Sequence, residues 1–380
     1  MIGIVSLFAD ITYEGSRSIV GPYLAQLGAN GAEVGIIAGL GELLGYGLRY
    51  FSGRLAEKTG QFWPITIFGY VIQMLSVPLL ALAGSWQVAA LLIVVERIGK
   101  ATRNPPRNAM LSHAGNLIGH GWVFGLHEAL DKLGAFSGPL IVAVVLARQG
   151  DYKTAFAMLL IPALLTVALV ITARLLYPKP EDLAPPSSPP LSAERLSRAF
   201  WLYMIAAALV AAAVPDFSLI SYHFGKTSTV PVSWIPVFYS LALGISGLSS
   251  LLLGKLFDKN GIIILIPLTL VTTLFAPLVF LGGFAAAMAG TILWGIGMGV
   301  HESMIPAAVA TMVPKERRAS AYGIFTAGYG VAWFIGSAII GMLYDVSIPA
   351  VIAFCVIAQI AAIPFLYAVR KKPVTSAAGS

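Results

Sequence analysis

Apolar residues along this chain fall into long, nearly continuous runs that are separated by short polar breaks. Each run has about 20 residues, the length of α-helix that crosses the hydrocarbon core of a bilayer. Because the runs are continuous and do not alternate with polar positions, they predict transmembrane helices and not the strands of a β-barrel. The twelve predicted spans cover residues 2–25, 32–55, 62–83, 87–111, 120–147, 153–176, 198–222, 232–256, 262–282, 285–312, 319–344 and 348–369.

One polar stretch is too long to be a turn between two spans. Residues 178–198, PKPEDLAPPSSPPLSAERLSR, combine proline, serine and charge, so they predict a linker. The predicted units are an N-terminal six-helix bundle at 1–177, a cytoplasmic linker at 178–197, a C-terminal six-helix bundle at 198–372 and a C-terminal tail at 373–380.

The two predicted bundles share a repeated octet. GRLAEKTG at Gly53–Gly60 returns as GKLFDKNG at Gly254–Gly261, and each copy lies between two apolar runs. This repeat indicates that one ancestral half was duplicated in parallel. A membrane protein built from two such halves has a natural ligand site at their interface near the middle of the bilayer, so the repeat favours transport.

Composition excludes a water-soluble protein. Hydrophobic residues make up 58% of the chain and charged residues only 11%, whereas soluble domains have roughly 25% charged residues. The single cysteine, Cys355, lies inside the last predicted span and forms no internal disulfide.

The formal net charge of +7 reflects a membrane orientation and not nucleic-acid binding. The loops between spans on one side hold only Arg148, Lys153 and Lys226. Under the positive-inside rule the opposite, richly basic side is cytoplasmic, so we expect both termini and the linker on the cytoplasmic face of the inner membrane. The basic residues on that side are Arg54, Lys58, Arg174, Lys179, Arg195, Arg198, Lys255, Lys259, Lys315, Arg317, Arg318, Arg370, Lys371 and Lys372.

The octet resembles the loop signature of the major facilitator superfamily, in which glycine, acid, base and glycine have this spacing. Gln61 replaces the base that usually follows. The resemblance covers the whole chain and implies an all-α membrane protein with twelve transmembrane helices in two pseudo-twofold-related six-helix bundles. It also implies that the loop is a conformational latch, with its acid near a helix N-terminus. The latch residues are Gly53, Glu57, Lys58 and Gly60 in the first copy and Asp258 and Lys259 in the second.

Ionisable residues at membrane depth are costly and therefore informative. They crowd the first, second, fourth and fifth predicted spans, where cations and acids nearly balance. Mutual pairing is one interpretation of this balance, but burying so many charges for packing alone is a poor exchange for apolar side chains. A water-filled cavity explains the set better. In the superfamily that the chain resembles, spans 1, 4, 7 and 10 line such a cavity.

Residue types suggest two roles in this cavity. Guanidinium and ammonium groups bind carboxylate or phosphate, and an acid that loses its cationic partner takes up a proton. The predicted substrate-binding residues are Arg17, Arg97, Lys100, Arg103, His301 and Trp294. The predicted proton-coupling residues are Asp10, Glu14, Asp131, Glu128, Asp216 and Glu302. The histidines and acids of spans 7 and 10 lack metal-ligand spacing, so we expect neither a metal nor a cofactor.

The fifth span contains a glycine pattern that resembles the antiporter motif of drug-exporting major facilitator families. It consists of Gly125, Gly134, Gly138 and Pro139, although the family's closing glycine pair is absent. The segment RIGKATRNPPRNAM at Arg97–Met110 is similar to one found in a group of bacterial and archaeal members. These glycines allow close helix packing, and the resemblance favours efflux.

The sequence therefore predicts a secondary active transporter that moves a small anionic or zwitterionic organic solute by alternating access, through proton antiport, as a monomer. The alternatives within transport are a broad drug or amphipath exporter and a proton-coupled symporter for uptake. An enzyme acting on lipid or acyl groups would need a base such as His127 or His301, but the acid that follows each histidine points about 100° away on a helix. A sensor that has lost transport is the last alternative. No Walker loop, nucleophile elbow or zincin helix is present, so we expect no enzyme activity.

Overall fold

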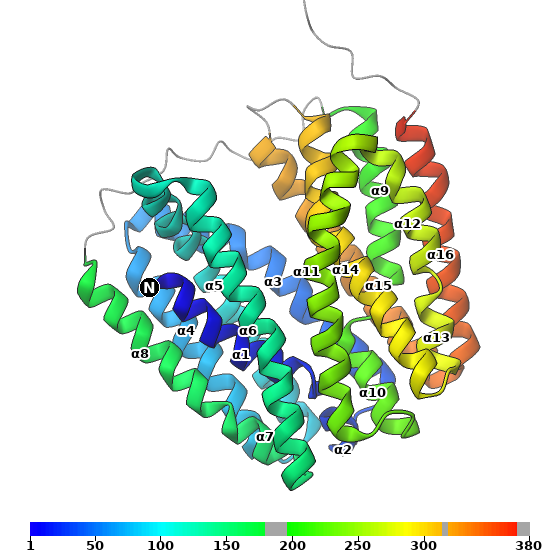
Figure 1. The fold of residues 1–380 in the computed structure, drawn as a ribbon, viewed down its shortest axis with the longest axis horizontal. Coiled ribbons are helices and arrows are strands. Elements are labelled where there is room, and N and C mark those ends of the chain that lie inside the picture. The colour runs from blue at the N-terminus through cyan, green and yellow to red at the C-terminus, as the bar shows by residue number, and fades with distance from the viewer. Residues whose placement is uncertain (179–195, 314–317, 371–380) are drawn as a thin grey trace, which may run out of the picture.

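The computed structural model describes residues 1–178, 196–313 and 318–370, and these residues form helices joined by short turns. The N-terminal bundle contains α1 (Ile2–Arg17), α2 (Val20–Gln26), α3 (Gly31–Thr59), α4 (Phe62–Leu79), η1 (Leu80–Leu82), α5 (Trp86–Ile118), α6 (His120–Gln149), α7 (Tyr152–Met158) and α8 (Leu160–Leu176). The C-terminal bundle contains α9 (Arg198–Ala213), α10 (Phe217–Thr227), η3 (Val232–Trp234), α11 (Ile235–Asn260), η4 (Gly261–Ile264), α12 (Leu265–Thr272), α13 (Phe275–Leu281), α14 (Phe284–Met312), α15 (Arg318–Val346) and α16 (Ile348–Arg370). The two bundles lie side by side (Figure 1).

These helices group into the twelve predicted spans. Eight stretches of the described chain are long and apolar enough to cross a membrane, and one of them, Val232–Leu281, contains two successive spans joined at Gly261. The first of the remaining three spans is formed by α1 and α2 together, the second by α3 and the third by α5. These three spans hold most of the charges predicted to face a cavity. The all-helical multi-pass membrane fold is therefore confirmed.

The first and seventh spans are each broken into two helices at equivalent positions. Pro22 has no N–H to donate to the carbonyl of Ser18, and its ring would clash with that carbonyl, so the helix breaks between α1 and α2. In the C-terminal bundle Pro215 lies in the corresponding break between α9 and α10. Asp216 then caps α10 by accepting a hydrogen bond from the backbone N–H of Ser218, at 2.8 Å.

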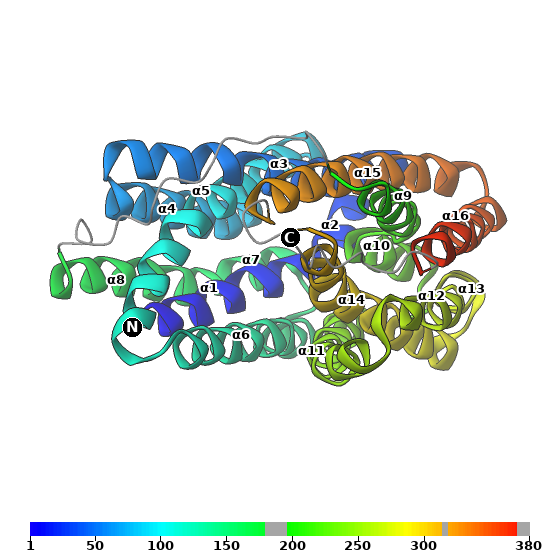
Figure 2. The same ribbon diagram turned by 90° about the horizontal axis from the view of Figure 1, so that it is seen from above.

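The neighbours of each helix repeat from one bundle to the other. Helix α1 packs on α6 as α9 packs on α15, α3 packs on α5 as α11 packs on α14, and α4 packs on α8 as α12 packs on α16. The repeated octet is therefore one sign of a repeated packing arrangement. Between the bundles, α3 lies along α15, α6 lies along α11 and α2 contacts α10 (Figure 2).

The hydrophobic cores of the described residues show where the bundles join. One cluster, which includes Tyr23, Leu24, Phe217 and Phe224, draws residues from both bundles. We call the end of the molecule that carries Tyr177 and Ser197, which flank the predicted linker, the linker end. The cluster lies at the opposite end, which we call the far end. Toward the linker end, the buried members of the two other clusters each come from one bundle. The bundles thus share a core only at the far end.

The repeated octets form the last helical turns of α3 and α11, not loops as predicted. Their residues are mostly compatible with a helix, so each helix continues to the final glycine. Gly60 has φ of 67° and Gly261 has φ of 64°. This left-handed backbone is readily available to glycine, which explains why both octets end in that residue.

Candidate functional site

A cavity of about 230 Å³ lies at the interface between the two bundles. Its N-terminal side is formed by α1, α3 and α5 and its C-terminal side by α14 and α15. The lining residues are Tyr13, Glu14, Arg17, Glu42, Gly45, Tyr46, Arg49, Arg97 and Lys100 on the first side and Met298, His301, Tyr329 and Trp333 on the second. All charged lining residues that the structure describes belong to the N-terminal bundle.

Two arginines and one glutamate form the centre of the charged side. Glu42 of α3 accepts from Arg17 of α1 and from Arg97 of α5, each at 3.0 Å. Arg97 also donates to the hydroxyl of Tyr13 and lies 3.4 Å from Glu96. One carboxylate therefore holds the charged residues of three helices together.

Arg17 also joins the two bundles. Its guanidinium forms an ion pair with Asp216, the residue that caps α10 in the C-terminal bundle. The Asp216 side chain is 1% exposed and that of Arg17 is 13% exposed, so little water screens the pair. A second link is made by Tyr239 of α11, which donates to Glu14 at 2.6 Å. Movement of one bundle against the other at this level must break both contacts.

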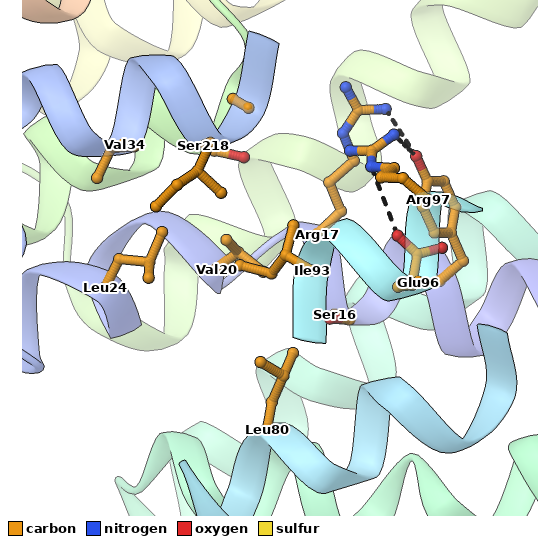
Figure 3. Close-up of a pocket in the computed structure, with 13 residues that line it drawn as sticks. Ser16, Arg17, Val20, Leu24, Val34, Leu80, Ile93, Glu96, Arg97 and Ser218 are labelled. Atoms are coloured by element: carbon orange, nitrogen blue, oxygen red, sulfur yellow. Dashed lines mark hydrogen bonds and ion pairs between the residues drawn. The ribbon is translucent and has the colours of Figure 1, made fainter. Parts of the chain in front are cut away.

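A much smaller cavity of about 20 Å³ lies beside the arginines, toward the far end (Figure 3). Arg17, Arg97 and Glu96 line one part of it, and apolar side chains such as Leu24 and Leu80 line the other. The space is about that of a single water-sized probe. Apolar packing thus closes the path from the charged cavity to the far end.

Helix α5 presents only part of its basic stripe to the cavity. Arg97 and Lys100 line the cavity, but Arg103 does not. Arg103 is 1% exposed and lies inside the N-terminal bundle, where it donates to Gln73 at 2.5 Å and to Tyr70 at 3.0 Å. Three residues along a helix correspond to a rotation of about 300°, which is about 60° short of a full turn. Basic residues at this spacing therefore point progressively further from the face on which the first one lies. The prediction that Arg103 faces the cavity does not agree with this position.

Lys100 and Arg49 are the cavity cations without a carboxylate within ion-pair distance in the described residues. The ammonium of Lys100 lies 3.4 Å from the centre of the Tyr13 ring, and the guanidinium of Arg49 lies 5.1 Å from the centre of the Tyr46 ring. Both arrangements are cation–π contacts. The cavity therefore has two positive groups that remain available to an anion.

The predicted acids of α1 and α6 differ in their surroundings, and only Glu14 among them lines the cavity. His127 is 3.5 Å from Asp131, and neither ring nitrogen of His127 has a hydrogen-bond partner among the described residues. Asp10 lies within electrostatic range of Asp131 and Lys100. Glu128 instead is exposed and pairs with Lys132 at 3.7 Å. Asp10 and Asp131 form a cluster, whereas Glu128 lies away from it.

The predicted residues of the C-terminal bundle separate into three places. Trp294 is buried in the shared core at the far end. Its indole N–H donates to the carbonyl of Pro215 at 3.0 Å, so it supports the break in the seventh span. His301 lines the cavity and is hydrogen-bonded to Tyr329. The side chain of Glu302 lies outside the described residues. Within the part of the chain that the structure describes, no group of three histidine, cysteine or acidic residues has metal-site geometry.

The predicted antiporter-like glycines differ in their surroundings. A methyl group on Gly138 would lie 2.9 Å from the Cα of Ile11, and one on Gly134 would lie 3.1 Å from the Cα of Leu7. Both glycines thus allow α6 to approach α1 closely, next to Pro139 within α6. Gly125 has open space around it and allows no such approach.

The charged latch residues are exposed. Among the described residues, Glu57 and Lys58 at the end of α3 form no ion pair, and the same holds for Asp258 and Lys259 at the end of α11. In this conformation these residues therefore do not form ion pairs that would join helices as predicted.

Sequence reasoning missed the aromatic members of the site. Tyr13 lies three residues after Asp10, on the same face of α1, but a tyrosine hydroxyl in a predicted span does not by itself indicate a binding site. Tyr239, Tyr329 and Trp333 are in spans where aromatic residues are ordinary core residues. Their role depends on contacts between helices that are distant in sequence.

The comparisons with known proteins agree with this architecture. The chain matches the family model of the Major Facilitator Superfamily over residues 2–305 and 212–380. It is 39% identical over 378 residues to the uncharacterized protein Rv2265 of Mycobacterium tuberculosis, covering 97% of this chain and 92% of that protein. It is 24% identical over 361 residues to the MFS-type transporter MJ1317 of Methanocaldococcus jannaschii, covering 91% and 88%.

Among solved structures, the fold is similar to that of the nucleoside transporter NupG, with a TM-score of 0.77 at 16% identity and 98% of both chains covered. The family model accounts for both bundles, and the structural likeness extends over nearly the whole chain. This chain therefore belongs to the Major Facilitator Superfamily and is a multi-pass membrane transporter of that type.

Proposed function

We propose that this transporter moves a small organic anion across the cytoplasmic membrane by alternating access, coupled to proton antiport. The observation that carries the proposal is the cationic cavity between the bundles, which is bridged by the ion pair of Arg17 and Asp216. Binding in such a cavity and movement of the bundles about it are the two requirements of alternating access.

The burial of α3 indicates which end of the cavity is closed. Gly31, Gly35 and Gly39 are packed against α15; for example, a methyl group on Gly35 would lie 3.0 Å from the Cα of Gly341. At the other end of the cavity the same helix is exposed, at the lining residue Arg49 and at Phe51. Since the shared core also lies at the far end, the cavity opens toward the linker end.

The distribution of basic residues supports an orientation of these two ends in the membrane. The linker end carries residues such as Arg54, Lys58 and Lys255, whereas the far end carries Arg148 and Lys226 among few others. By the positive-inside rule the linker end is cytoplasmic. In this proposal the structure represents the inward-facing state, with both termini in the cytoplasm.

The charges of the cavity favour an anionic solute. Glu42 is already engaged by two arginines, and Glu14 accepts from Tyr239. Lys100 and Arg49 remain free to bind an anion, and Arg17 and Arg97 add positive potential beside them. A cationic drug would meet this positive potential with both acids already occupied, so the structure favours anion transport over the drug-exporter alternative.

The acids beside these cations support proton coupling. Asp10 lies within electrostatic range of Lys100 and of Asp131, and Asp131 is 3.5 Å from His127. Asp216 is held by Arg17 in this state. Breaking the Arg17 contact would leave a buried carboxylate without its cation, and such a group takes up a proton. We propose Asp216 and the Asp10–Asp131 group as proton sites. The glycine pattern of α6 favours efflux over uptake.

Liposomes that contain the purified protein and the pH dye pyranine test this proposal. Benzenesulfonate and cyclohexanesulfonate are suitable probes, because they stay ionised and do not carry protons across the bilayer by themselves. Antiport raises the internal pH as the anion enters, symport lowers it, and uniport leaves it unchanged.

A double variant, Arg49→Gln with Lys100→Gln, is expected to lose this uptake, while Lys255→Gln, at an exposed site outside the cavity, keeps it. If benzyltrimethylammonium enters in place of the sulfonates, the proposed anion specificity is wrong. If no solute enters and the internal pH does not respond, proton-coupled transport itself is wrong.

A further inference from the structure

The C-terminal side of the cavity has a chemistry that the charged residues do not explain. Its described lining residues are Met298, His301, Tyr329 and Trp333, none of which is acidic or permanently charged. Three of the four side chains are aromatic rings. The His301 imidazole and the Tyr329 hydroxyl are hydrogen-bonded to each other, so this side offers a ligand mainly ring surface, which suits an apolar part of the ligand.

The rings form one ordered cluster. The His301 ring is 5.9 Å from Tyr329 and 5.9 Å from Trp333, at interplanar angles of 80° and 86°. Tyr329 lies 5.7 Å from Trp333 at 71°, and Tyr46 of α3 reaches across the interface to Tyr329 at 6.2 Å and 84°. These edge-to-face contacts are the geometry that aromatic rings prefer. They hold the rings on the C-terminal side of the cavity in place before any ligand binds.

The cluster is close to the free cations. Tyr46 is in contact with Tyr329 on one side and with the guanidinium of Arg49 on the other. Lys100 lies over Tyr13, which lines the same cavity. Asp10 and Glu14 act electrostatically on Lys100, but neither is within ion-pair distance of it in the described residues. Cationic and aromatic groups therefore face one shared space from opposite bundles.

The size of the cavity suits a small ligand. A single six-membered ring with one anionic substituent can be placed within about 230 Å³.

We propose that the substrate is a small aromatic anion, whose carboxylate or sulfonate binds Lys100 and Arg49 and whose ring packs against Trp333, Tyr329 and His301. The inference rests on the proposed function and adds the class of substrate to it. One ligand then contacts both bundles, and its binding favours the conformation in which the two sides of the cavity are close.

Equilibrium binding of three probes to the purified protein tests the inference. Benzenesulfonate and cyclohexanesulfonate have the same charge and carbon number and differ in aromaticity, while benzyltrimethylammonium has a ring and the opposite charge. We expect benzenesulfonate to bind about 3- to 10-fold more tightly than cyclohexanesulfonate, the effect of one good aromatic contact. Benzyltrimethylammonium is expected to bind weakly.

Two variants separate the contributions of ring and charge. Trp333→Leu should weaken benzenesulfonate binding and leave cyclohexanesulfonate binding unchanged, whereas Lys100→Gln should weaken both sulfonates by the same factor. Trp333→Phe keeps a ring and should retain most of the preference. Trp201→Leu, at a tryptophan that is 38% exposed on α9, is the matched control and should change neither affinity.

The outcomes distinguish this inference from the proposed function. Equal affinity for the two sulfonates in the unmodified protein, or a preference that survives in Trp333→Leu, overturns the aromatic class and leaves anion transport standing. Tight binding of benzyltrimethylammonium with no sulfonate binding overturns both. If Trp333→Leu does not fold, the comparison of the two sulfonates and the Trp333→Phe variant still decide.

Discussion

Gly21 is the position where a single methyl group should change which side of the membrane the cavity faces. It lies in α2, at the contact with α10 that closes the far end. A Cβ at this position would overlap the carbonyl oxygen of Ser218 and lie 2.6 Å from the backbone nitrogen of Tyr222, whereas real Cβ contacts essentially never fall below 3.0 Å. These neighbours are backbone atoms, so they do not rotate away. The two helices must separate.

The expected magnitude follows from this overlap. Inserting a methyl group into a well-packed contact costs about 1–3 kcal/mol. In Gly21→Ala the cost falls only on the conformation in which α2 and α10 touch. The equilibrium should therefore shift toward the outward-facing state by about 5- to 150-fold. The two helices belong to different bundles, so the two cores toward the linker end, whose buried members each come from one bundle, are not disturbed.

Alkylation of a cysteine in the cavity measures this shift. Gly45 lines the cavity and has open space around it, so Gly45→Cys in a Cys355→Ala background provides the label site. A membrane-impermeant maleimide added from the side of the far end, which the proposed orientation makes periplasmic, should react faster in Gly21→Ala than in the parent. Gly84→Ala is the control, because Gly84 also lies at the far end but has no atom near its Cβ position.

Unchanged labelling from the periplasmic side, together with a lower melting temperature, would refute this reasoning. It would mean that the α2–α10 contact is permanent and that the bundles do not separate there. Faster labelling of Gly84→Ala as well would mean that the label reports general loosening and not opening of the far end.

Three further predictions concern other parts of the molecule. Asp216→Asn removes the ion pair across the bundle interface and should increase the same periplasmic labelling while abolishing the proton signal in liposomes. Gly138→Ala should lower thermal stability by about 1–3 kcal/mol because α6 is forced away from α1, whereas Gly125→Ala should stay within about 0.5 kcal/mol. Asp151 caps α7 at the membrane surface; slight burial opposes its ionisation, but hydrogen bonds from Thr154 outweigh this and lower its pKa. The cap therefore stabilises the fold at neutral pH and is lost as pH falls below the usual carboxylate range. Asp151→Ala should be about 1 kcal/mol less stable than the parent at pH 7, and the melting temperatures of the two proteins should converge in acid.

The buried charges of the N-terminal bundle are connected and not scattered. From Arg103 the contacts run through Gln73, Glu96 and Arg97 to Glu42, and Arg17 continues them to the C-terminal bundle. Such networks strengthen when every member has a partner and are costly when one is removed. A change at the cavity is thus transmitted to the interior of the bundle.

The near balance of cations and acids in the charged spans is compatible with two interpretations, mutual pairing and a water-filled cavity. In the structure both hold, because Arg97 pairs with Glu42 and at the same time lines the cavity. Lys100, three residues further along α5, is the cation that pairing leaves free.

The sequence by itself determined the twelve spans, their order and the internal repeat, because each follows from local chemistry. A backbone in lipid must satisfy its own hydrogen bonds, so any apolar run of about 20 residues becomes a helix wherever it is placed. The positions of helix ends at Gly60 and Gly261 and of the breaks near Pro22 and Pro215 are local in the same sense.

Tertiary structure decided which side chains form the site. From the sequence, Arg97 and Arg103 on α5 had equal standing, but their directions differ by about 120° around the helix, and the packing of α5 places the first in the cavity and the second against Tyr70 inside the bundle. Partners such as Arg17 and Asp216 are 199 residues apart, and no local pattern links them. Helix rotation and packing partners depend on the whole set of neighbouring helices, and for that reason only the assembled bundles reveal the cavity and its chemistry.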